Sequence, residues 1–174
     1  MLFGDYNPGG RLTQTWPKSV TQLPPIEDYD LRKGRTYMYS AAEPLYPFGH
    51  GLSYTTFAYS NLRFSAPSLA ENATITVRVD VTNTGSRSGS EVVQLYVSHI
   101  DSVVPRPRKE LKGFTRVLLR PRETRTIEIP LRSADLAYWD QERSRWHLEQ
   151  GSVMVRAGGS SARADIEANL RVGR

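Results

Sequence analysis

The chain has 174 residues, enough for one complete domain and part of a second. Its 23 basic and 18 acidic residues leave a net charge of +5, a modest excess that favours solubility and does not predict a nucleic-acid partner. The chain has no cysteine, which excludes disulfides, thiolate metal sites and thiol catalysis. No apolar run approaches the roughly 20 residues of a membrane span, so no membrane partner is expected.

The sequence of residues 1–58 predicts an irregular segment without long strands or helices. Residues 7–10 are a turn sequence, and the weak alternation over residues 11–16 predicts one short strand. Residues 36–39 predict a second strand. The opening residues lack the charged and apolar regions of a signal peptide, and they read as the middle of a larger protein. Because the segment is too broken to build its own core, we expect it to lie against another surface.

Residues 46–58 predict a sharply turned joint. Prolines remove donors and fix φ, while Gly49 and Gly51 allow backbone angles that other residues resist. His50, between these glycines, is predicted to be a polar packing residue; contact across the joint or with a ligand pocket remains an alternative. The side chains expected to anchor the joint are those of Tyr46, Phe48, Tyr54 and Phe57.

From residue 59 onward the sequence predicts an all-β sandwich. Residues 73–82 alternate, with Ile75, Val77, Val79 and Val81 on one face, which is typical of a strand with one buried side. Gly113 is predicted to mark a β-bulge, and residues 135–140 predict a helical turn or a strand. Seven or more short strands follow one another with frequent turns, which indicates a sandwich. Further strands are expected at 62–64, 92–97, 111–119, 126–131, 146–148, 153–155 and 166–172.

The sequence of residues 46–57 resembles the junction before the C-terminal domain of glycoside hydrolase family 3, which includes β-glucosidases and β-xylosidases. Residues 4–12 resemble the end of that family's α/β-sandwich domain. Arg122 departs from the family, which often has glycine in this turn. The segments similar to the family's fibronectin type III-like domain are 81–85, 89–97, 106–114 and 139–140.

The resemblance implies three regions. Residues 1–45 are the remnant of the preceding α/β-sandwich domain with a linker, residues 46–58 are the junction, and residues 59–174 are an immunoglobulin-like, fibronectin type III-like β-sandwich. Because the family's catalytic carboxylates lie upstream, the resemblance implies a non-catalytic structural module that partners the upstream catalytic domains of a parent glycosidase. Arg11 and Arg35 are expected to pair with carboxylates there.

The parent activity implied is hydrolysis of terminal β-linked glucosyl or xylosyl residues. A stand-alone carbohydrate-binding or protein-interaction module remains the alternative. The family resemblance favours a bacterial periplasmic or secreted protein and leaves a cytoplasmic one open. The chain itself does not decide the compartment.

We predict no catalytic residue, cofactor or metal ligand in this chain. A retaining glycosidase needs two carboxyl groups about 5–5.5 Å apart. The acids at residues 27–30 are expected to be solvated loop residues, because no apolar wall raises their pKa values. The histidines are isolated from one another along the sequence, which does not predict a metal site. The basic residues between 106 and 125 predict a solvated sheet edge.

Trp16, Trp139 and Trp146 are candidate sugar contacts, because sugar rings stack on exposed aromatic faces. The alternative for Trp139 and Trp146 is that they fill the sandwich core or cap its end, since β-sandwiches commonly bury a tryptophan. Trp16 is alternatively expected to pack on an absent domain. An oligosaccharide therefore stays among the possible partners.

Overall fold

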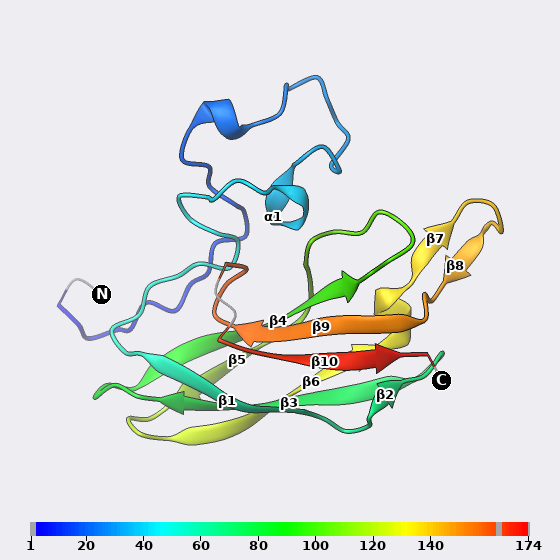
Figure 1. Cartoon of the computed structure of the whole chain (residues 1–174). Coiled ribbons are helices and arrows are strands. Elements are labelled where there is room, and N and C mark those ends of the chain that lie inside the picture. Colours follow the sequence, from blue (N-terminus) through cyan, green and yellow to red (C-terminus); the bar gives the residue numbers. More distant parts are fainter. Residues whose placement is uncertain (1–2, 163–164, 174) are drawn as a thin grey trace.

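The computed structural model describes residues 3–162 and 165–173, and it confirms the predicted all-β sandwich. Two sheets pack face to face (Figure 1). One sheet has the strand order β1-β3-β6, from Phe57–Phe64, Thr74–Asn83 and Thr124–Arg132. The other has the order β2-β10-β9-β4-β5, from Ser68–Leu69, Ile166–Val172, Gly151–Gly158, Gly89–Ile100 and Glu110–Leu119.

The core lies between these sheets and follows from alternation along the strands. Val77, Val79 and Val81 of β3 are each at most 1% exposed, as are Val93 and Leu95 of β4. Burying each such side chain contributes about 1.5–3 kcal/mol relative to exposure. The predicted inward faces of these two strands are therefore confirmed.

Gly113 does form a bulge. Leu95 pairs with Gly113, but the next residue, Tyr96, pairs with Leu111, so β5 holds one extra residue. A Cβ atom at Gly113 would lie 2.4 Å from Cγ2 of Ile129, which explains why no side chain fits there.

A two-stranded hairpin extends from the sandwich (Figure 1). It follows the 3-10 helix η2, Ser133–Leu136, and consists of β7, Tyr138–Asp140, and β8, Arg145–His147. The helical turn and the strand predicted as alternatives for residues 135–140 therefore both occur, one after the other.

The N-terminal segment, which we define as residues 3–56, lies on the outer side of the five-stranded sheet (Figure 1). Its regular elements are the 3-10 helix η1, Val20–Gln22, and the single helical turn α1, Thr36–Tyr39. None of the helices in the described part of the chain is both long and apolar enough to cross a membrane.

Both strand predictions in this segment were wrong. Residues 36–39 form α1, which begins at Thr36 with φ of 59°, and the backbone N–H of Ser40 closes the turn on the Thr36 carbonyl. Residues 11–16 form only one isolated bridge, between Trp16 and Tyr46. Strand propensity at residues 36–39 reflects β-branched and aromatic side chains, but a strand also needs a neighbour with a free edge.

Candidate functional site

The candidate site is the junction, where residues 46–58 meet β4 of the sandwich. Gly49 has φ of 80°, and a Cβ atom there would lie 2.0 Å from Oε1 of Gln94. The Gln94 amide donates to the Gly49 carbonyl at 3.2 Å and to the Gly159 carbonyl at 2.7 Å. Oε1 of Gln94 accepts from the Tyr96 hydroxyl at 2.6 Å. Only glycine lets the backbone approach this buried amide so closely.

An aromatic stack continues the junction outward. The rings of Tyr37 and Phe48 stack with centroids 4.4 Å apart, and Tyr37 meets Tyr96 edge-on at 5.9 Å. The Tyr37 hydroxyl accepts from the Leu111 backbone N–H at 3.1 Å. Burial raises the pKa of both tyrosines. The helical turn α1 therefore places one aromatic ring between the segment and the sheet.

A buried ion pair closes the other side of the junction. Arg11 donates to Oε2 of Glu91 at 2.6 Å, and the Tyr59 hydroxyl donates to Oε1 at 2.7 Å. The Glu91 side chain is 4% exposed. Burial raises the pKa of Glu91 above its usual range, and the Arg11 charge and the Tyr59 hydrogen bond oppose this shift. One carboxylate oxygen thus fastens the N-terminal segment, and the other is held by Tyr59 of β1.

The structure corrects one expectation for the arginines. Arg11, expected to reach an absent domain, pairs with Glu91 inside this chain. Arg35 holds its own loop, because its guanidinium donates to the backbone carbonyls of Asp28 at 2.7 Å and Pro25 at 2.6 Å.

A hollow of about 660 Å³ beside this ion pair contains two acids, Glu91 and Asp165. Such a pair deserves comparison with a glycosidase site, where one carboxyl must be free to attack and the other to donate a proton. Oδ2 of Asp165 accepts from the Gly159 backbone N–H at 3.3 Å, and both oxygens of Glu91 carry structural bonds. The arrangement favours fastening rather than catalysis.

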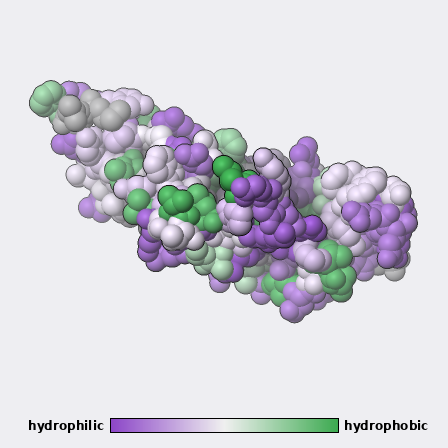
Figure 2. Space-filling model, turned by 90° about the horizontal axis from the view of Figure 1, so that it is seen from above, coloured by the Kyte–Doolittle hydropathy of each residue, from purple (hydrophilic) through white to green (hydrophobic). Residues whose placement is uncertain are grey.

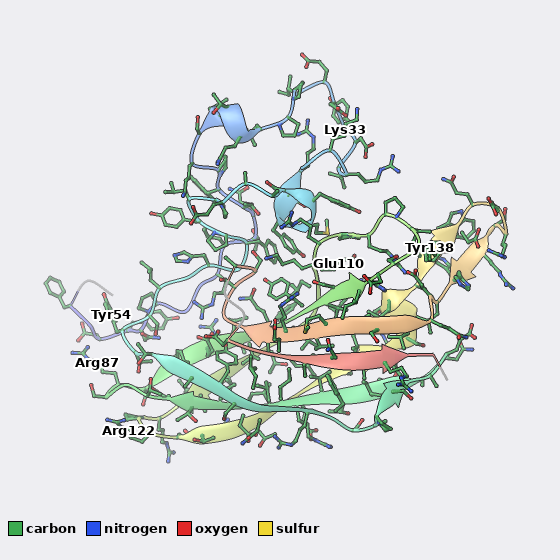
Figure 3. All side chains as sticks on the ribbon, in the orientation of Figure 1. Lys33, Tyr54, Arg87, Glu110, Arg122 and Tyr138 are labelled. Carbon is green, nitrogen blue, oxygen red and sulfur yellow. The ribbon has the colours of Figure 1, made fainter. Side chains whose placement is uncertain are left out.

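The remaining junction residues divide between buried and exposed positions. The His50 ring stacks on Tyr46 at 5.2 Å, and the His50 carbonyl accepts from the Leu12 backbone N–H at 2.8 Å. Phe57 packs against the core. Tyr54, labelled in Figure 3, is 47% exposed. A Cβ atom at Gly51 would lie 2.3 Å from the Gly10 carbonyl oxygen, so this glycine also marks a close backbone contact.

The loop acids considered from the sequence are paired with basic residues of the same loop. Asp28 and Asp30 form ion pairs with Lys33 and Arg32, whose hydrogen bonds lower the pKa values of both acids. Within residues 3–162 and 165–173, no three potential ligands gather in a way that could hold a metal ion.

Arg106 does not belong to a solvated edge as predicted. Its side chain is 9% exposed, lies 3.5 Å from Glu149 and covers the Tyr138 ring at 4.7 Å. Burial opposes ionisation of Glu149, but the Ser102 hydroxyl, the Val103 N–H and Arg106 outweigh it and lower the pKa.

The tryptophans lie outside the core. Trp139 is 50% and Trp146 68% exposed, and both belong to the β7–β8 hairpin, so of the alternatives that they fill the core or cap its end the first is wrong. Trp16 is 46% exposed and bridges Tyr46 in the N-terminal segment.

Sequence reasoning missed Tyr37, Glu91 and Gln94. The second face of β4 carries Val92, Gln94 and Tyr96 with no charge, which is a signal that both faces of this strand are covered. Glu91 stands on the inward face of β4 next to the buried Val93 and Leu95, where a carboxylate requires a partner.

The fold and the junction together define a fibronectin type III-like β-sandwich with a preceding segment fastened to its outer face. Residues 91–161 match the model of the fibronectin type III-like domain, and residues 1–54 match that of the glycosyl hydrolase family 3 C-terminal domain. The chain belongs to glycoside hydrolase family 3, and it corresponds to the C-terminal part of β-glucosidases and β-xylosidases of this family.

Two curated relatives illustrate the match. The chain is 39% identical over 184 residues to thermostable beta-glucosidase B of Acetivibrio thermocellus, covering 99% of this chain and 24% of that protein. It is 42% identical over 172 residues to a beta-xylosidase of Formosa agariphila, covering 96% of this chain and 24% of that protein. The chain thus spans about a quarter of the length of these relatives.

Solved structures agree with this assignment. The beta-glucosidase of Kluyveromyces marxianus in complex with glucose superposes with a TM-score of 0.90 at 36% identity, over 100% of this chain and 22% of that one. Beta-D-glucoside glucohydrolase of Trichoderma reesei superposes with a TM-score of 0.88 at 30% identity, over 99% and 28%.

Proposed function

We propose that this chain is the non-catalytic C-terminal structural module of a β-glycosidase, and that it stabilises and orients upstream catalytic domains. The relatives named β-glucosidase and β-xylosidase support hydrolysis of terminal β-linked glucosyl or xylosyl residues as the parent activity. In this proposal residues 1–45 belong to the preceding α/β-sandwich domain and its linker, residues 46–58 are the junction, and residues 59–174 are the module.

The observation that carries the proposal is the uneven distribution of exposed apolar side chains. Of 17 large apolar side chains that are exposed in the described residues, 12 lie within residues 3–54. Figure 2 shows apolar patches among polar ones on the molecule seen from above. Large apolar exposure of this kind marks an interaction surface, and upstream domains of the same protein are its natural partner. The twelve are Phe3, Tyr6, Trp16, Val20, Leu23, Ile26, Tyr29, Leu31, Leu45, Tyr46, Leu52 and Tyr54.

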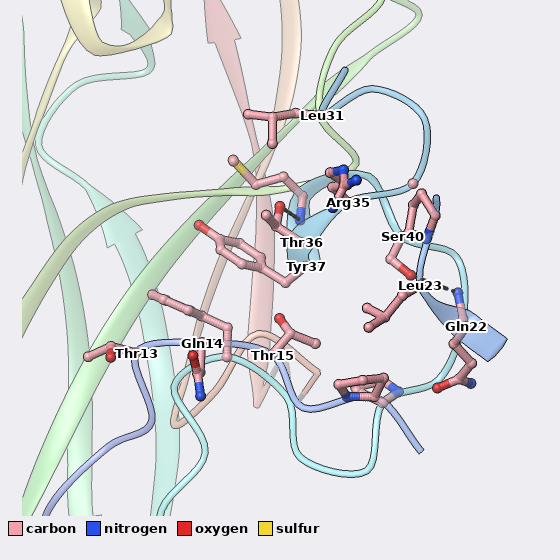
Figure 4. A pocket seen from close by; sticks show the side chains of 17 residues that line it. Thr13, Gln14, Thr15, Gln22, Leu23, Leu31, Arg35, Thr36, Tyr37 and Ser40 are labelled. Carbon is pink, nitrogen blue, oxygen red and sulfur yellow. Dashed lines mark hydrogen bonds between the residues drawn. The ribbon is translucent and has the colours of Figure 1, made fainter. Parts of the chain in front are cut away.

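A hollow of about 490 Å³ inside the segment supports the same proposal (Figure 4). Leu23, Leu31 and Tyr37 line it, and the Thr15 side chain adds a buried hydroxyl with no hydrogen-bond partner among the described residues. A buried hydroxyl without a partner costs free energy. This hollow is therefore suited to receive side chains from an upstream domain, an apolar one against its walls and a polar one that bonds to Thr15.

A domain that docks at this surface would also be positioned relative to the sandwich. The same segment is fastened by the buried Arg11–Glu91 pair and by Tyr37, whose ring meets that of Tyr96 and whose hydroxyl accepts from the Leu111 backbone N–H. A domain that binds the segment is therefore held in a fixed orientation relative to the module.

A chimaera tests docking. This chain would replace the matching region of the Acetivibrio thermocellus relative, and activity on a chromogenic β-glucoside and the melting temperature would be measured. We expect an active chimaera that loses thermal stability and activity when Ile26 and Tyr29, 80% and 86% exposed, are both replaced by serine.

The matched control replaces Val103 and Phe114 of the sandwich, 86% and 67% exposed, by serine. Equal effects from the two pairs would contradict docking through the segment.

Assay of the chain alone tests the non-catalytic part of the proposal. We expect no turnover of chromogenic β-glucosides or β-xylosides. Turnover that survives purification and disappears in Glu91→Gln would overturn it.

A further inference from the structure

The β7–β8 hairpin presents two tryptophans side by side on one face. Trp139 and Trp146 occupy directly opposed positions on the two strands, and their rings meet edge to face with centroids 5.8 Å apart at 78°. Both remain at least half exposed. Each ring therefore limits the freedom of the other, while one aromatic surface stays open to solvent.

The opposite face of the hairpin is fixed to the sandwich. Tyr138, labelled in Figure 3, meets His147 edge-on at 5.5 Å and carries the Arg106 guanidinium at 4.7 Å. Asp140 accepts from the Arg143 backbone N–H at 3.1 Å and from its guanidinium at 2.6 Å, which closes the hairpin turn. The tryptophans are thus carried on an ordered support, so little ordering is needed when a ligand binds.

A hollow of about 290 Å³ lies beside Trp146, between η2 and the loop before β3. Trp146 and Leu148 form its apolar wall, and Glu71, Asn72 and Ser133 supply polar side chains. Among the described residues, none of these three polar side chains has a hydrogen-bond or ion-pair partner. Ser133 is only 4% exposed, and it lines the hollow.

We propose that this hollow and the tryptophan pair bind a neutral oligosaccharide, with one pyranose ring in the hollow and the next on Trp139. A pyranose ring has an apolar C–H face and hydroxyl groups around its edge. The indole of Trp146 matches the face, and the carboxylate, amide and hydroxyl of Glu71, Asn72 and Ser133 match the edge. The volume lies at the lower end of ligand pockets, which suits a single ring.

This site goes beyond the proposed structural role, because it would add substrate or polymer contact at a surface that the docking segment does not use. A purely apolar protein partner fits less well, since it would bury three unpaired polar side chains at a cost in free energy.

Titration of the full chain with cellohexaose and xylohexaose tests the proposal. The indole N–H signals of the three tryptophans would be followed by NMR. We expect saturable shifts of the Trp139 and Trp146 signals with at least one sugar, and no shift of the Trp16 signal, which serves as an internal control.

Variants locate the contacts. Trp146→Ala is expected to weaken binding about tenfold or more, and Trp139→Ala somewhat less. Asn72→Gly retains the left-handed backbone at φ of 57° while removing the amide, and we expect several-fold weaker binding. Phe114→Ala removes another exposed ring, on β5, and should leave binding unchanged.

Two outcomes would overturn the proposal. One is the absence of saturable indole shifts with both sugars up to about 10 mM, a concentration that reveals dissociation constants in the millimolar range. The other is undiminished binding in Trp146→Ala. Should that variant fail to fold, the wild-type indole shifts and Asn72→Gly decide the matter.

Discussion

The N-terminal segment and the sandwich differ in what keeps them ordered. All fully buried apolar side chains of the described chain belong to the sandwich, from Leu69 to Val172. The segment has two helical turns and is fastened at a few points, chiefly by Arg11 and Tyr37. A region without a core of its own takes its order from the surfaces that it touches. The comparison teaches that the sandwich is ordered by its own core, whereas the segment is ordered by its contacts with the sandwich.

The largest expected effect on the free energy of unfolding comes from a substitution in the sandwich core. Leu95→Ala removes a fully buried side chain from the core and should lower the free energy of unfolding by about 2–5 kcal/mol. Leu23→Ala, at a position 54% exposed in the segment, should change it by at most about 0.5 kcal/mol. Urea denaturation measures both. Similar losses from the two variants would show that the segment has a core of its own.

The next effect tests the fastening. Arg11→Met keeps the apolar stem but leaves Glu91 buried without its counter-charge, at a cost of about 2–3 kcal/mol, since Arg11 is itself slightly exposed. Hydrogen exchange should accelerate at the backbone N–H groups of Leu12 and Gly49, whose bonds join the residue next to Arg11 to the junction residues Gly49 and His50.

The double variant Arg11→Met/Glu91→Gln should recover part of this loss, because it removes the unpaired charge. A loss as large as that of the single variant would contradict the role given to the ion pair.

A smaller effect concerns pH and belongs to the sandwich. Burial, and then the Arg106 charge, lower the pKa of His99 from 6.5 to about 4, with Glu149 and Glu110 opposing and Lys112 adding slightly. The neutral ring is favoured in the folded state. Its contribution is therefore complete above pH 6.5 and is lost as the pH falls toward 4, by an amount on the order of 2 kcal/mol.

The difference in unfolding free energy between wild type and His99→Gln, measured from pH 7 to pH 4.5, isolates this contribution. The raised pKa of Glu91 makes the unfolding free energy increase as the pH falls, but this contribution is common to both proteins and cancels in the difference. Lowered pKa at Glu149 acts only at lower pH. A difference that does not change with pH would rule out burial of a neutral His99.

The smallest effect is a gain. Arg122 has φ of 63° in the turn between β5 and β6, where glycine is less strained. Arg122→Gly should raise the free energy of unfolding by about 0.5–1 kcal/mol. Arg120→Gly, two residues earlier and outside the left-handed region, should lower it. Thermal denaturation that ranks the two variants equally would contradict this reading of the turn.

The sequence was informative where one local rule decides the structure. Period-two alternation identified β3 and β4 because each strand has an apolar face, and Gly113 identified the bulge because no Cβ atom fits there. Residues 36–39 were assigned wrongly because their strand propensity has no neighbouring edge to pair with.

The candidate site was less predictable because its contacts are distant in sequence. Arg11 and Glu91 are 80 positions apart, and no local pattern relates them. The exposure of Trp139 and Trp146 depends on the hairpin register, which places both on the solvent side. Sequence alone therefore proposed sugar contact and core packing together, and the arrangement of strands excludes core packing.

The bridge between Trp16 and Tyr46 has a consequence for how such modules diverge. The backbone N–H of Trp16 donates to the Tyr46 carbonyl, and the backbone N–H of Leu45 donates to the Trp16 carbonyl, each at 2.8 Å. Residues 17–44 therefore form a loop whose two ends are joined by the Trp16–Tyr46 bridge. Doubling the length of such a loop costs only about 0.6 kcal/mol in closure entropy. Residues of this loop outside α1 can therefore change in number and kind to suit a different neighbouring domain, while the Trp16–Tyr46 bridge and the contacts of Tyr37 stay the same.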